Sequence, residues 1–544
     1  MINIKSGLRF FILLAFPVLA GQISEAYTPL LSRNGNLVRW DLKESPVNQP
    51  NIIEGRVEFF INRLGTPDLE DAGDGTGGEF DIIRRAFGVW NHNPTSLMRF
   101  NDLKLTDQSW GTGSDETNLV IFDETNKSGL FPPGSGIIAM TMTTYEDELY
   151  GGVLDGHLRD TDLILNGKDF TFSSGLEPEK INLLSIVVHE IGHVCGLDHS
   201  FHQKINPQDD SVDVPSLFPY LNFADDQLSQ PDQDDFSGLT ELYPDKDFND
   251  QINGSLAGMV MIDGEPAAGI DVVAYQNRRP VVSTFSRLNG SFHIHAVPPG
   301  TYLIRTNILS RANISLVQDI TTEVHSQYFG TAGNAGIAQD ASPVTVLAGK
   351  KRANVLLNLR RLAQPDFLEP NDTPQQALLL PVDGTQVLQQ PWKTGDPEWM
   401  KFQASKGRIY EILTDNLGFF ANPKLDLFDS DATTLLASHD NIDISKMNYA
   451  ARIRFTAQRN GSFYIRLTDV KSALSPGSSC EVSVREAGPA RLDGNGDGMI
   501  DSMDLFSFST HWTPVVGNQE FIKDGISTLP TTDLIELLGV LAGK

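Results

Sequence analysis

Three histidines and a glutamate stand at a spacing that suits metal chemistry. The segment from Val188 to Ser200 reads V-H-E-I-G-H-V-C-G-L-D-H-S, which contains the pattern H-E-x-x-H-x-x-G-x-x-H. On a helix, His189 and His193 are four residues apart, so both imidazoles leave the same face and can bind one metal ion. Glu190 lies beside them, where a carboxylate can take a proton from a zinc-bound water.

A glycine and a third histidine complete the pattern. Gly196 can adopt the left-handed conformation that ends a helix, and the turn brings His199 to the metal as a third ligand. Three protein ligands leave one coordination position open, which is typical of a catalytic zinc. Chance explains the pattern poorly, because the chain has 11 histidines in 544 residues. The sequence therefore predicts a zinc site with Glu190 as its general base.

The helix that must carry these residues has a buried stripe of its own. Apolar side chains recur along it at 3.6-residue spacing, namely Ile181, Leu184, Val188, Ile191 and Cys195. Cys195 is therefore predicted to be a packed thiol and not a metal ligand. Because Cys195 and Cys480 fall in different predicted domains, no disulfide is expected between them.

Length, charge and the N-terminus limit the class of protein. A chain of 544 residues is too long for one core and predicts several domains. A formal net charge of -28 disfavours nucleic acid as a partner. The apolar run from Phe10 to Ala20 is too short to span a bilayer, and no later stretch is suited to span one. Residues 1–26 are predicted to be a signal peptide, with cleavage after Ala20 or Ala26, so a secreted or cell-surface location is expected.

Residues 27–247 resemble the matrixin-like branch of the metzincin metalloendopeptidases. Besides the histidine motif, Asp234 to Pro244 reads D-D-F-S-G-L-T-E-L-Y-P, which is similar to the final helix of that catalytic domain. The resemblance implies an α+β fold with a twisted mixed sheet, an active-site helix and a catalytic Zn²⁺. A strand over Val57 to Ile61 and an amphipathic helix over Phe80 to Trp90 fit this expectation.

Two further segments resemble parts of the family's site. Ile137, Ile138 and Ala139 resemble the edge strand that binds substrate as an additional strand, although an ordinary sheet strand is an equally good interpretation. Residues 157–166 resemble its antiparallel neighbour. Leu217 stands where the family's Met-turn has its methionine, and a swap of such similar volume usually costs less than about 1.5 kcal/mol.

The rest of the chain predicts small all-β domains, because apolar and polar residues alternate between Gly and Pro. Residues 250–361, with G-S-F-H-I-H-A-V-P-P-G-T-Y at 290–302, resemble a carboxypeptidase-regulatory-like, transthyretin-type β-sandwich. Residues 365–486, with L-E-P-N-D-T at 368–373, resemble a pre-peptidase C-terminal β-sandwich. Both are expected to position or tether the enzyme.

Residues 490–544 contain a second metal signature. A calcium loop takes oxygens from positions 1, 3, 5, 7, 9 and 12. Those positions are Asp493, Asn495, Asp497, Met499 through its carbonyl, Asp501 and Asp504. The segment resembles a dockerin type I repeat, which implies a small α-helical domain that binds Ca²⁺ and, as partner, a cohesin-like or cell-surface protein.

The sequence thus predicts a secreted zinc metalloendopeptidase that hydrolyses peptide bonds in extracellular proteins. The alternative is a non-catalytic adhesion or scaffold protein built on a decayed metzincin domain. Leu217 and a long acidic stretch after His199 are the features that support this alternative.

Overall fold

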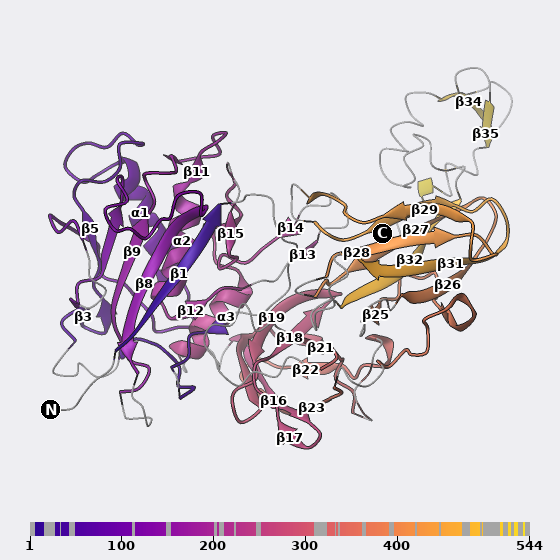
Figure 1. Cartoon of the computed structure of the whole chain (residues 1–544), viewed down its shortest axis with the longest axis horizontal. Coiled ribbons are helices and arrows are strands. Elements are labelled where there is room, and N and C mark those ends of the chain that lie inside the picture. The colour runs from indigo at the N-terminus through magenta and orange to yellow at the C-terminus, as the bar shows by residue number, and fades with distance from the viewer. Residues whose placement is uncertain are drawn as a thin grey trace. The chain divides into compact units, whose positions relative to one another are not determined.

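The computed structural model divides the chain into two compact units (Figure 1), which are Met1–Ala335 with Ala341–Leu362, and Gly336–Asp340 with Ala363–Lys544. It describes residues 6–15, 28–32, 34–42, 49–110, 115–147, 154–200, 204–205, 212–221, 223, 225–245, 252–308, 324–331, 333, 335, 338–361, 366–390, 397–418, 421–444, 448–470, 479–489, 492, 512–514, 520–523, 527–530 and 537–538. The described part of the chain is mostly β with few helices.

The first unit opens with a seven-stranded mixed sheet in the order β15-β1-β8-β9-β7-β5-β6. These strands are β1 (Ser6–Ala15), β5 (Phe60–Asn62), β6 (Lys104–Thr106), β7 (Leu119–Phe122), β8 (Ile137–Glu146), β9 (Leu158–Leu165) and β15 (Tyr220–Leu221). β8 runs antiparallel to β9 on one side and to β1 on the other. Every residue of β8 is buried, so the strand forms part of the core.

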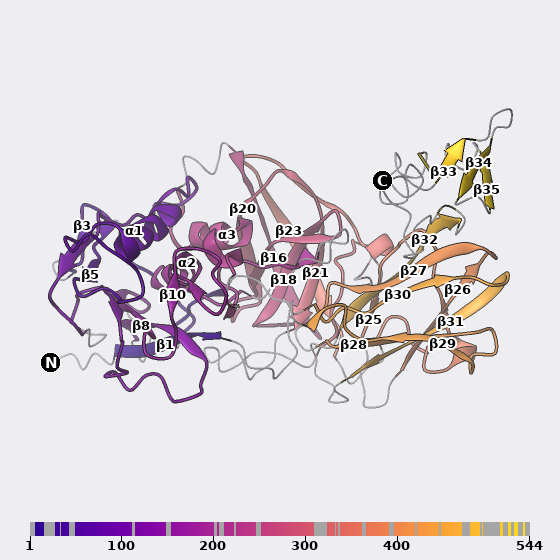
Figure 2. The same ribbon diagram turned by 90° about the horizontal axis from the view of Figure 1, so that it is seen from above.

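Helices α1 (Gly78–Asn91) and α2 (Leu183–Val194) lie on one side of this sheet (Figure 2). α1 buries the side chains that predicted it, which are Phe80, Ile83, Phe87 and Trp90. α2 is buried along its whole length, and the Asn182 side chain caps it by accepting a hydrogen bond from the Ser185 amide. The helix therefore begins two residues after Ile181, where the apolar stripe starts.

Short elements connect this layer. The strand pairs are β2 (Thr28–Pro29) with β12 (Leu197–Asp198), β3 (Ile52–Ile53) with β4 (Arg56–Val57), β10 (Phe172–Ser173) with β11 (Ile181–Asn182), and β13 (Lys204–Ile205) with β14 (Val212–Asp213). The 3-10 turn η1 (Gln227–Ser229) leads into the last helix of this part, α3 (Gln233–Leu242).

A pair of β-sheets follows within the same unit. One sheet holds β16 (Gly254–Ile262), β17 (Glu265–Pro266), β20 (Ser291–Val297) and β23 (Lys351–Leu359). The other holds β18 (Ile270–Gln276), β19 (Arg279–Phe285), β21 (Gly300–Ile308) and β22 (Val344–Val346). Apolar side chains from both sheets form one core, including Leu256, Val260, Val272, Ile294 and Ile304. We refer to residues 254–359 as the sandwich.

The second unit also contains two main sheets. One has five strands, β24 (Leu378–Leu379), β26 (Glu398–Ala404), β31 (Gly461–Asp469), β28 (Pro423–Phe428) and β29 (Leu435–His439). The other has four, β25 (Val387–Gln389), β32 (Cys480–Pro489), β27 (Arg408–Asp415) and β30 (Arg452–Thr456). The 3-10 turns η2 (Ala338–Asp340) and η3 (Pro374–Gln376) also belong to it.

Among the described residues after 490, three segments form strands where helices were expected, while Leu537 and Leu538 are helical. β33 (Trp512–Pro514), β34 (Glu520–Lys523) and β35 (Ser527–Pro530) make an antiparallel sheet. Pro514 and Pro530 disfavour a helix there, because proline cannot donate the backbone hydrogen bond of a helix interior. The predicted calcium ligands between Asp493 and Asp504 lie outside the described residues.

None of the helices in the described ranges is both long and apolar enough to cross a membrane.

Candidate metal centre

The three histidines of the sequence motif lie together at the end of α2. His189 and His193 come from the helix, and His199 follows strand β12. One ligand-type atom from each of the three residues lies within 4.8 Å of the others. The Nε2 atoms of His189 and His193 are 3.1 Å apart, close to the separation of about 3.3 Å expected for two nitrogens on one tetrahedral zinc.

The outer nitrogens of two histidines fix how their rings point. His189 Nδ1 donates a hydrogen bond to the Ser216 carbonyl (2.7 Å), and His193 Nδ1 donates to the Leu197 carbonyl (2.8 Å). With the proton on Nδ1, each Nε2 presents a lone pair, and the two lone pairs face each other. Such an arrangement is repulsive without a cation between them and favourable with one, so these residues fit zinc.

Burial keeps the imidazoles neutral, which is the form that binds a metal. It lowers the pKa of His193 to about 4, and it lowers the pKa of His189 and His199 well below the usual value, with neighbouring histidines adding to both shifts. Cys195 is buried as a free thiol, as predicted, and burial raises its pKa. Cys480 is also free and buried, so the two cysteines form no disulfide.

Glu190 is fully buried next to the histidines. Its Oε2 accepts a hydrogen bond from the Thr141 hydroxyl on β8, whereas its Oε1 has no hydrogen-bond partner. Burial raises the pKa of Glu190 to about 8. A carboxylate with one oxygen fixed and the other unused is well arranged to exchange a proton. The contact of Thr141 with Glu190 was not predicted from the sequence, although Thr141 lies in the strand that the sequence did identify.

Gly196 makes the turn that carries His199 back to the helix. Its φ is +93°, in the left-handed region that glycine adopts without strain. A Cβ at this position would lie 2.3 Å from the Val38 carbonyl oxygen, so a larger residue would also clash with backbone. The structural role expected for Gly196 at the helix end is therefore present.

Leu217 lies beneath the centre and packs against the helix. It is fully buried, and a Cβ added to Gly192 would lie 2.4 Å from its side chain. Its carbonyl accepts a hydrogen bond from the Ser200 amide (2.9 Å), while the preceding carbonyl, that of Ser216, holds His189. Leu217 is thus packed against the helix and forms part of the turn that holds His189 and Ser200.

The turn beneath the metal is fixed by α3. Asp235 Oδ2 accepts hydrogen bonds from the Ser216 amide (2.9 Å), the Ser216 hydroxyl (2.8 Å) and the Asp232 amide (2.9 Å). The Asp232 side chain in turn accepts from the Asp234 and Asp235 amides, which forms a capping box. Sequence reasoning found this helix but not the role of Asp235, although the D-x-x-D spacing at a helix start was available as a signal.

The residues predicted to hold substrate, Ile137, Ile138 and Ala139, are at the start of β8. On the side that faces β9, the carbonyls of Ile137 and Ile138 both accept hydrogen bonds from Asn166. Its backbone N–H donates to Ile138 and its side-chain amide donates to Ile137. The opposite edge of β8 pairs with β1, which runs antiparallel to it.

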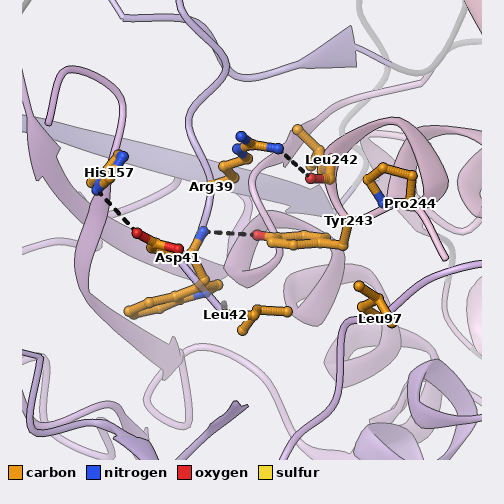
Figure 3. Close-up of a pocket in the computed structure, with 9 residues that line it drawn as sticks. Arg39, Asp41, Leu42, Leu97, His157, Leu242, Tyr243 and Pro244 are labelled. Atoms are coloured by element: carbon orange, nitrogen blue, oxygen red, sulfur yellow. Dashed lines mark hydrogen bonds and ion pairs between the residues drawn. The ribbon is translucent and has the colours of Figure 1, made fainter. Parts of the chain in front are cut away.

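A separate cavity of about 310 Å³ lies at the C-terminal end of α2, and its lining includes Arg39, His157 and Tyr243 but no histidine of the metal cluster. Figure 3 shows His157 and Asp41 pointing toward each other and Arg39 toward the Leu242 carbonyl. The Tyr243 hydroxyl donates to the Cys195 carbonyl (2.7 Å). The wall of this cavity therefore satisfies a carbonyl at the end of the active-site helix.

The matrixin family model matches residues 78–244. This range contains the three histidines, Glu190, and the side chains of Thr141 and Asp235 that support them. The match supports a metallopeptidase. No curated protein matches the chain.

Among solved structures, the chain is similar to the pre-peptidase C-terminal domain of a collagenase from Bacillus anthracis, with 15% identity, 21% of this chain and 100% of that chain covered, and a TM-score of 0.17. It is also similar to the TIE protein of Bacillus anthracis (10% identity, 44% and 32% covered, TM-score 0.13). A third is the secreted serine protease VesC from Vibrio cholerae (8% identity, 43% and 44% covered, TM-score 0.16). Scores this low do not establish a shared fold.

Proposed function

We propose that the protein is a zinc-dependent metalloendopeptidase that hydrolyses peptide bonds in extracellular proteins. The observation that carries this proposal is the convergence of two Nε2 lone pairs, from His189 and His193, beside His199 and the buried carboxylate of Glu190. Three nitrogen ligands, with a carboxylate at the adjoining position of the same helix, suit an open metal site.

Zinc bound to the three histidines would polarise the scissile carbonyl and acidify a water at the open position. Glu190 would accept a proton from that water through Oε1 and later donate it to the leaving amine. Thr141 would hold Oε2 and so fix the direction of the carboxylate. Burial raises the pKa of Glu190, and a raised pKa would help this carboxylate to hold the proton between the two transfers.

The substrate would bind along the edge of β8 that faces β1. This edge accepts an extended segment running antiparallel, with Ser6 opposite Glu146 and Leu14 opposite Ile137. β1 belongs to the predicted signal peptide, whose removal would free the edge for a peptide. A peptide on this edge would run past Thr141, which donates to Glu190, and so toward the metal centre.

The test is cleavage of unfolded casein by the zinc-loaded full chain, beside Glu190→Ala. Removal of the general base should reduce the rate by about 100-fold or more while one zinc per chain is retained. Equal cleavage by both proteins, or none by either with zinc bound, would refute the peptidase and favour the adhesion or scaffold alternative. The intact packing of Leu217 removes one of the two reasons for that alternative.

We also propose that the protein is exported and that one Ca²⁺ binds through Asp493, Asn495, Asp497, Met499, Asp501 and Asp504. The support is in the sequence alone, from the apolar N-terminal run and the six matched loop positions. Mass spectrometry of the exported protein should find a mature chain that begins after Ala20 or Ala26. Calcium titration of the full chain should fill one site that Asp493→Ala abolishes, and that variant would also test a cohesin-like partner.

A further inference from the structure

Helix α3 of the catalytic part lies against strands β19 and β20 of the sandwich, within the same compact unit (Figure 2). The Ser237 hydroxyl on α3 donates to the His295 carbonyl on β20 (2.6 Å), and Glu241 pairs with Arg287 just beyond β19 (2.6 Å). The acidic member of this ion pair is almost fully buried. The contact between the two parts is therefore specific and polar as well as close.

One buried carboxylate in this contact reaches in two directions. Asp234, only 1% exposed, accepts a hydrogen bond at Oδ1 from the Ser283 hydroxyl on β19 (2.8 Å) and at Oδ2 from the Ser200 hydroxyl (3.1 Å). Ser283 and Ser200 are both 0% exposed. Asp234 thus joins a strand of the sandwich to the residue that directly follows the third metal ligand.

We propose that Ser283 is a positioning residue for the zinc site, acting through Asp234 and Ser200 on His199. The sandwich then completes the metal centre instead of serving as a separate tether, even though it lies outside the residues 78–244 that the matrixin model matches. This inference rests on one part of the proposed function, namely that zinc binds to the three histidines.

Physical reasoning connects the hydroxyl to the metal. A buried carboxylate oxygen that loses a donor is left less well satisfied, and a reorientation of Asp234 that compensates for the loss would disturb its bond to Ser200. Ser200 is also held at its amide by the Leu217 carbonyl, so the bond to Asp234 is one of the contacts that position the loop carrying His199. Groups that orient metal ligands typically change metal affinity by about 10- to 100-fold when they are removed. Ser283 is one step further out, so we expect about 3- to 10-fold.

The experiment measures the rate of zinc release from the full chain into excess chromophoric chelator, for wild type, Ser283→Ala and Ser291→Ala. The last variant is the matched control, because it makes the same change in the same sandwich, at a hydroxyl that donates to the nearby Asn289 side chain in an exposed turn. Ser283→Ala should release zinc about 3- to 10-fold faster at an unchanged secondary structure, whereas Ser291→Ala should stay within about twofold of wild type.

If Ser283→Ala does not fold, Ser283→Cys replaces it, since a thiol is similar in size and a weaker donor, and it should accelerate release by a smaller factor. A folded Ser283 variant that releases zinc at the wild-type rate would overturn the proposal. A wild type that binds no zinc would overturn the proposed zinc site as well, whereas a wild-type release rate in the variant overturns this inference alone. Zinc release is measured without substrate, so a failure of this inference is distinct from a failure of the peptidase, which depends on casein cleavage and Glu190.

Discussion

Two of the metal-binding histidines have one nitrogen committed to a backbone carbonyl, which leaves the other for the metal. The carbonyls belong to Ser216, which lies in a turn, and to Leu197, which opens the short strand β12, and both follow α2 in the chain. The identity of the ligands and of Glu190 was predictable from the sequence, because H-E-x-x-H-x-x-G-x-x-H fixes residue types at helical spacing. The two carbonyl partners could not be predicted in this way. Every residue has a backbone carbonyl, so residue type does not indicate which carbonyl will contact a histidine ring.

Gly192 supplies a first test at this scale, since Leu217 fills the space where its side chain would be. We expect Gly192→Ala to destabilise the zinc-loaded protein by about 1–3 kcal/mol, the usual cost of an overpacked core. Chemical denaturation measures this cost. In a Leu217→Ala background the same change should cost much less, whereas an equal cost in both backgrounds would show that Leu217 is not the obstacle.

Asp271, a buried residue of β18, gives a pH-dependent test. Burial raises its pKa to about 8, against hydrogen bonding from Asn307 and the nearby charge of Arg305. Between pH 4 and 8 the folded protein therefore holds a proton that the unfolded chain has released, so this group makes stability fall as the pH rises through that window.

Asp271→Asn removes this titration. Unfolding curves of wild type and variant at pH 5 and pH 8 should show that the variant gains about 1–3 kcal/mol relative to wild type at the higher pH. A difference that does not change with pH would contradict the buried-proton account.

At the scale of elements, the capped start of α3 supports the turn beneath the metal. The helix could be predicted, because its D-D-x-x-G pattern resembles the end of a matrixin domain. Its use as a support could not, because the Asp235 and Ser216 side chains meet only through tertiary packing. The same holds for Thr141, which reaches Glu190 from β8, a strand far from α2 in the chain.

Asp232→Ala should therefore weaken the site as well as the helix. Loss of an N-cap costs about 0.5–2 kcal/mol, and here it also removes a contact that orders the helix start next to Asp235. Denaturant titration of the zinc-loaded chain measures the change, with the exposed Gln230→Ala nearby as control. Equal stability of both variants would mean that the cap contributes nothing.

At the scale of the whole molecule, the two compact units have separate apolar cores, and the metal cluster belongs to the first. The sequence predicted several domains, and it predicted all-β domains after residue 250 because apolar and polar residues alternate there between Gly and Pro. It did not predict that the sandwich contacts the catalytic part, because Ser283 and Arg287 are ordinary strand and loop residues until α3 is placed against them.

Removal of zinc should therefore destabilise one unit and not the other. Zinc at about 100 times its dissociation constant stabilises its unit by about 2.7 kcal/mol, which corresponds to roughly 3–5 °C for a unit as long as Met1–Ala335 with Ala341–Leu362. Calorimetry with and without chelator should show a shift in the unfolding temperature of the first unit alone. That shift should be absent in His193→Ala, which lacks a zinc ligand. A uniform shift of all transitions would contradict this division.

We propose that His189, His193 and His199 hold one zinc with a coordination position left open. X-ray absorption at the zinc edge of the full chain, loaded with one equivalent, tests it most directly. We predict three imidazole nitrogens and one oxygen at about 2.0–2.1 Å. A shell that contains sulfur at about 2.3 Å, a fourth imidazole, or zinc that washes out of the protein would contradict it.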